Sequence, residues 1–140
     1  MKRAVLASVL AVVVTALPIA ACHEVEAPTD EGVCWRMHQG PGAAASFTPV
    51  ARDVDGLETC AVLLEAVRLG GQPTVDGAYQ GSFIFVDATG IRSAQSLGGF
   101  HYPIFQPPQV ATIDHDLKEI LKSHSGRLPD PGEIGLERSR

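Results

Sequence analysis

The stretch DVDGLETCAVLLEAVRLGG, residues 53–71, has the strongest periodic pattern in the 140-residue chain. Its apolar side chains recur at the spacing of one helical face: Leu57, Cys60, Ala61, Leu64 and Val67. Asp55 stands at a possible N-cap with Glu58 three residues later, which is the arrangement of a capping box. Gly70 and Gly71 mark the expected end of the helix. The stretch therefore predicts an amphipathic helix that buries Cys60 near its start.

Two short apolar segments precede this helix. VCWRM, residues 33–37, is rich in strand-forming residues and predicts a strand, with Trp35 and Met37 in the core beside its cysteine. FTPVA, residues 47–51, predicts an edge strand, because Pro49 cannot donate a hydrogen bond to a neighbouring strand.

A hairpin and a second helix are predicted after the first helix. Residues 83–86 form a strand pattern, residues 87–90 a turn that ends in glycine, and the return strand starts at Ile91. The second helix is expected to start near Pro108. Its apolar stripe consists of Val110, Ile113, Leu117, Ile120 and Leu121.

The order strand, helix, strand, strand, helix predicts a small α+β domain over residues 33–124. The acidic, turn-prone residues 22–32 predict a tether. Residues 125–140 have no periodicity and predict a disordered tail.

The N-terminus has the pattern of a secretory signal peptide. Lys2 and Arg3 precede an uncharged run over residues 4–21, which ends in small residues. An uncleaved transmembrane anchor is the alternative, because the run is close to the length needed to span a membrane. Pro18 and the alanines before Cys22 favour cleavage, so we predict a signal peptide over residues 1–21.

The residues Ile19-Ala20-Ala21-Cys22 resemble the lipobox of bacterial lipoproteins. This resemblance implies that the Cys22 thiol receives a diacylglyceryl group and that the chain is cut just before it. Ordinary cleavage after Ala21 would leave the same cysteine without lipid. His23 follows, where aspartate tends to retain lipoproteins at the inner membrane. The resemblance therefore implies the outer membrane, facing the periplasm, with the membrane as a partner through Cys22.

The chain has three cysteines, so one remains after any single disulfide. If Cys22 is lipidated, Cys34 and Cys60 remain as a pair, and the exported protein has no free thiol. The alternatives pair Cys22 with Cys34 or with Cys60 and leave a reactive thiol. We expect a lipid anchor on Cys22 and a disulfide between Cys34 and Cys60.

Charge narrows the choice of partners. Removal of residues 1–21 leaves 119 residues, enough for one domain, with 9 basic and 16 acidic side chains. This acidic balance argues against nucleic acid and anionic lipid surfaces as partners.

One charged segment has a spacing that could hold a metal. The segment IDHDLKE contains Asp114, His115, Asp116 and Glu119 within two helical turns. His115 and Glu119 lie four residues apart, but two ligands from one helix make an incomplete site. We therefore expect a solvated helix face and no metal site.

The segment GGFHYPIFQPP, residues 98–108, combines aromatic side chains with prolines that stiffen the chain. We expect it to pack on the core with His101 at its surface. Alternatively, Phe100, His101 and Tyr102 form an exposed surface that binds a partner. His101 could also act as a general base, although no second catalytic residue lies at a recognisable spacing.

These patterns predict a small cell-envelope lipoprotein without a cofactor. Its domain would be a non-catalytic binding or structural module for an unidentified protein or cell-wall partner. The alternatives are a small periplasmic hydrolase that uses His101 and an inner-membrane protein that keeps residues 4–21 as its anchor.

Overall fold

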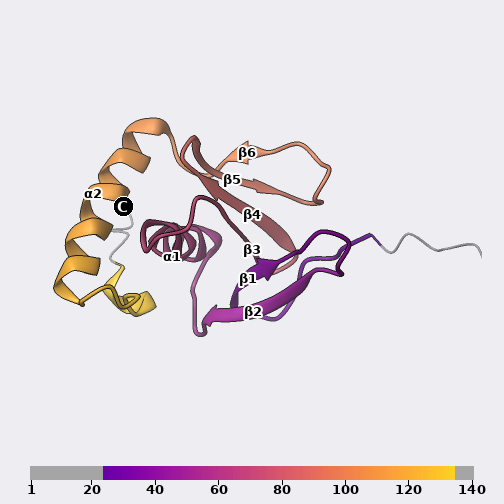
Figure 1. Ribbon diagram of the computed structural model, residues 1–140, viewed down its shortest axis with the longest axis horizontal. Coiled ribbons are helices and arrows are strands. Elements are labelled where there is room, and N and C mark those ends of the chain that lie inside the picture. The colour runs from indigo at the N-terminus through magenta and orange to yellow at the C-terminus, as the bar shows by residue number, and fades with distance from the viewer. Residues whose placement is uncertain (1–23, 135–140) are drawn as a thin grey trace, which may run out of the picture.

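Antiparallel strands and two helices make up the part of the chain that the computed structural model describes, residues 24–134 (Figure 1). The strands are β1 (Cys34–His38), β2 (Ser46–Ala51), β3 (Val75–Tyr79), β4 (Ser82–Asp87), β5 (Gly90–Ala94) and β6 (Tyr102–Pro103). They form one sheet in the order β2-β1-β3-β4-β5-β6. The helices are α1 (Leu57–Leu69) and α2 (Pro107–Ser123). This architecture confirms the predicted α+β fold class.

Both helices lie on the same side of the sheet. α1 packs mainly on β3 and β4, while α2 packs on α1 and reaches β5. In Figure 1, α2 is accordingly the outer helix. The main core fills the space between helices and sheet, and its fully buried apolar side chains include Leu63, Leu64, Ile84, Val86, Ile91 and Leu117. The predicted helix is thus the element around which the domain is packed.

α1 begins one residue later than the capping pattern predicts. Gly56 is the N-cap in an extended conformation, and no side chain caps the helix. Asp55 Oδ1 accepts a hydrogen bond from Thr59 Oγ1 at 2.8 Å, and Glu58 is exposed. The predicted capping box of Asp55 and Glu58 is wrong, because Glu58 falls at the second helical position instead of the third.

α2 begins at Pro107, close to the predicted start at Pro108. Gln106 caps it through a capping box with Gln109. The prolines at its start lack an N–H, which costs nothing there because the first N–H groups of a helix have no partner within the helix. Leu117 and Leu121 are the buried members of the predicted apolar stripe.

The predicted strands around the helices are confirmed, and the structure contains two further strands that were not predicted. β1 and the edge strand β2 lie where expected, and Asp87 pairs with Gly90 around a two-residue turn in the predicted hairpin. β3 and β6 were missed. β3 has the sequence VDGAY, in which aspartate and glycine weaken the strand signal, and β6 is only two residues long.

Gly77 of β3 lies where α1 comes closest to the sheet. A Cβ atom at this position would be 2.3 Å from the Trp35 carbonyl oxygen and 2.5 Å from Leu64 Cδ1. The absence of a side chain therefore lets Leu64 sit directly on the sheet.

A smaller cluster covers the other face of the sheet. It consists of Ala27, Met37, Ala78 and Phe83, and the half-buried Trp35 packs against it. The predicted core role is confirmed for Met37. However, Met37 and Trp35 lie on the face opposite Cys34, which belongs to the main core.

The predicted tether is wrong from residue 24 onward. Val25 and Ala27 pack against the smaller cluster, while Glu24 and Glu26 are exposed. The Gly81 N–H donates a hydrogen bond to the Pro28 carbonyl oxygen at 2.8 Å. The acidic composition concealed an alternation of apolar and charged residues, which is the pattern of a segment that lies on a surface. Residues 22 and 23 are outside the described residues.

Disorder from Ser125 onward is also contradicted, as far as residue 134. Leu128 and Ile134 pack against the main core, and a short 3-10 helix spans Pro131–Glu133. Two apolar contacts six residues apart give no periodic signal, so the pattern could not predict this packing. Residues 135–140 lie outside the described part of the chain.

Within residues 24–134, no helix is both long and apolar enough to cross a bilayer. The predicted signal peptide of residues 1–21 and the predicted anchor Cys22 lie outside the described residues.

Candidate functional site

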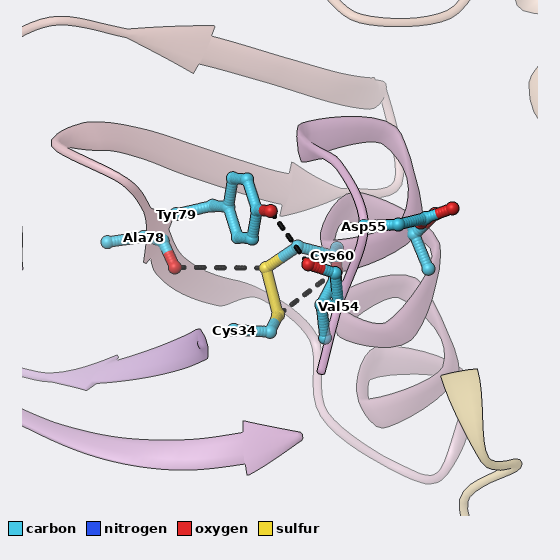
Figure 2. The surroundings of a disulfide bond; sticks show 7 residues. Cys34, Val54, Asp55, Cys60, Ala78 and Tyr79 are labelled. Carbon is cyan, nitrogen blue, oxygen red and sulfur yellow. Dashed lines mark hydrogen bonds between the residues drawn. A yellow bond between two sulfur atoms is a disulfide. The ribbon is translucent and has the colours of Figure 1, made fainter. Parts of the chain in front are cut away.

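The predicted disulfide between Cys34 and Cys60 is confirmed and joins β1 to α1 (Figure 2). Both cysteines are fully buried, with Cα atoms 5.3 Å apart. Cys60 Sγ lies 3.7 Å from the Ala78 carbonyl oxygen. This is a close contact and not a hydrogen bond, because a disulfide sulfur has no proton to donate. Beside the disulfide, the Tyr79 hydroxyl donates a hydrogen bond to the Val54 carbonyl oxygen at 2.8 Å. These surroundings give the disulfide a structural role.

The segment around β6 presents aromatic side chains to solvent. Phe100 is 85% exposed and Tyr102 is 63% exposed, and they are the exposed large hydrophobic residues of the described chain. The expectation that the segment packs on the core is wrong for these two residues, although Ile104 and Phe105 do pack there. β6 is a short edge strand (Figure 1), so side chains around it have few neighbours to cover them.

His101 lies between the two exposed aromatic residues and stacks on the sheet. Its ring lies parallel to that of Phe85 on β4, with centroids 4.2 Å apart and an angle of 10° between the planes. His101 is exposed, as expected. The aromatic patch, defined here as Phe100, His101 and Tyr102, is therefore anchored at its centre and open to solvent on both sides.

Charged residues near the aromatic patch are engaged in structural pairs. Partial burial raises the pKa of Asp87, but hydrogen bonds from Thr89 and Arg92 outweigh this effect and lower it to about 2. On β3, burial raises the pKa of Asp76 and Asp87 raises it further, whereas His101 and Arg92 oppose the shift. His101 thus influences Asp76 through charge, and the ion pair in the region joins Arg92 to Asp87.

His101 lies on an open surface and lines none of the main clefts of the described residues. Three clefts of about 720, 600 and 420 Å³ on the described part of the molecule are lined by other residues. The two larger clefts share Asp53 and Asp55 at the start of α1, far along the chain from the aromatic patch.

A buried polar cluster between the helices was missed by sequence reasoning. Glu65 of α1 is only 1% exposed, and Arg68 Nε donates to its Oε2 at 2.8 Å. Asp114 of α2 lies 3.9 Å from Arg68. Burial raises the pKa of Glu65, the hydrogen bond from Arg68 opposes this, and Asp114 raises it again. The signal was present in the sequence, as a glutamate inside the apolar run of α1 with an arginine three residues later.

The other polar residues of the segment IDHDLKE form a solvated face, whereas Leu117 is buried. His115, Asp116 and Glu119 are exposed, while Asp114 turns toward α1. Within residues 24–134, no group of three or more His, Cys, Asp or Glu side chains is placed to hold a metal ion.

Comparison of the chain with protein-family models, curated proteins and solved structures found no match.

Proposed function

We propose that this chain is a small cell-envelope lipoprotein, attached through Cys22 to the outer membrane and facing the periplasm. The disulfide between Cys34 and Cys60 is the observation that carries the proposal. It uses two of the three cysteines in the chain, so Cys22 has no cysteine left to pair with in the same molecule. A thioether to lipid accounts for that cysteine in an oxidising compartment.

The domain acts as a non-catalytic binding or structural module with the aromatic patch as its contact surface. Phe100 and Tyr102 support this role, because exposed aromatic side chains offer contact area with few rotatable bonds to order. The structural disulfide and the packed terminal segments hold the module in one shape.

The intact mass of the protein, purified from membranes of an expressing bacterium, tests the proposal. We expect a chain that begins at Cys22 and carries a diacylglyceryl increment. Cys22→Ser should abolish both the increment and the cleavage before residue 22.

A double variant, Cys34→Ala with Cys60→Ala, is the matched control, because it removes two cysteines and should keep the lipid. A chain that retains Met1, or one that starts at an unmodified Cys22, would contradict the proposal.

A further inference from the structure

The N-terminal segment and the aromatic patch approach the same end of the sheet. Pro28 is hydrogen-bonded to Gly81 in the turn between β3 and β4. In the antiparallel register, Phe83 beside this turn pairs with Ala94, the last residue of β5, so the loop from β5 to Phe100 starts at that end. Val25 and Leu97 pack against the same small cluster.

The distance from the proposed anchor to the domain is short. Only His23 separates Cys22 from Glu24, the first described residue. An extended chain advances at most about 3.6 Å per residue, so the Cα atoms of Cys22 and Glu24 are within about 7 Å of each other. Because Val25 and Ala27 are packed on the sheet and Pro28 bonds to the turn between β3 and β4, a lipid on Cys22 would hold this end of the sheet against the bilayer.

We infer that Phe100 and Tyr102 insert into the headgroup region of the membrane to which Cys22 is anchored. This inference rests on the proposed lipid anchor and names the partner of the aromatic patch as a phospholipid surface. Aromatic side chains favour the membrane–water interface, because the ring is apolar and the phenol of tyrosine remains hydrated. The anchor supplies the affinity, and the two rings set the orientation of the domain.

The charge near the anchor specifies the kind of lipid. Glu24, Glu26, Asp30 and Glu31 are exposed in the N-terminal segment. These carboxylates would be repelled by an anionic surface within a Debye length. The surface that fits is a zwitterionic phospholipid such as phosphatidylethanolamine.

The test measures the depth of a nitroxide label in vesicles of phosphatidylethanolamine and phosphatidylcholine. Full-length protein with Phe100→Cys is matured in a bacterium, purified with its lipid, labelled and reconstituted. The disulfide cysteines are buried and do not react, and the Cys22 thiol is blocked by lipid. We expect the ratio of collisions with oxygen to collisions with a water-soluble nickel chelate to be several-fold higher at position 100 than at a label on the exposed side of α2 in the same vesicles.

Tyr102→Cys provides a second labelled position, and Lys118→Cys on the exposed side of α2 is the matched control. Protection at positions 100 and 102 with an aqueous signal at position 118 is the expected result. Aqueous signals at all three positions, or equal protection at all three, would overturn the inference, and a lipidated mass would leave the proposed function standing. A mass without diacylglyceryl would instead overturn the proposed function, and the membrane contact with it.

Discussion

Gly77 shows how a single residue sets the spacing between α1 and the sheet. We expect Gly77→Ala to destabilise the domain by about 2 kcal/mol, the usual scale of overpacking, because its methyl group would overlap the Trp35 carbonyl and Leu64. Urea denaturation of the variant measures this change. Gly98→Ala is the control, since a Cβ there meets nothing within 4 Å. Equal midpoints for the two variants would show that α1 does not press on β3 at this point.

Glu65 gives the stability of the domain a dependence on pH with a defined sign. Its pKa is raised from 4.5 in the folded state, so the folded protein binds a proton more tightly than the unfolded chain. The free energy of unfolding should therefore fall as the pH rises from 4.5 through the raised pKa. Glu65→Gln should flatten this part of the profile, as measured by denaturation at a series of pH values.

Glu58→Gln is the matched control for Glu65, because Glu58 lies on the same helix and is exposed. It should leave the slope unchanged. If Glu65→Gln kept the slope of the wild type, another group would be responsible for the pH dependence.

At the scale of elements, the disulfide fastens α1 to β1. Removal of a bridge with a sequence separation of 26 residues should cost about 3.5 kcal/mol in the chain-entropy description. We expect the double variant Cys34→Ala with Cys60→Ala to lose this amount in guanidinium denaturation. Reduced wild-type protein is the comparison that separates loss of the bridge from loss of side-chain volume. An unchanged midpoint in both would contradict the proposed bracing role.

Ile134 tests whether the C-terminal segment contributes to the core. The side chain is 9% exposed and packs against the main core, so Ile134→Ala should destabilise the domain by about 2 kcal/mol. Thermal unfolding measures the effect, with the exposed Arg127→Ala as control. No difference between these two variants would favour the disordered tail that the sequence predicts.

The elements with strong periodicity were predictable, and those defined by tertiary contacts were not. α1, α2 and the hairpin of β4 and β5 follow from local patterns, because each buries a continuous face or ends in a turn glycine. β3 depends on the approach of Leu64 to Gly77, which no local pattern contains. The exposure of Phe100 and Tyr102 likewise depends on how short β6 is, and the local pattern, which predicts that this segment packs on the core, does not contain that length.

At the scale of the whole molecule, the two faces of the sheet differ in how they are covered. Within residues 24–134, the helices cover one face, while the N-terminal segment and the loop that leads to the aromatic patch pack on the other. The thinly covered face is also the one closest to Cys22 along the chain.

Prolines lie on both outer strands of the sheet, Pro49 on β2 and Pro103 on β6. Neither strand offers a continuous row of N–H donors to an approaching chain. A lipid anchor concentrates copies of a protein in two dimensions, where extension of one sheet by another would lead to self-association. The prolines would oppose this route for copies held on one membrane by the proposed anchor.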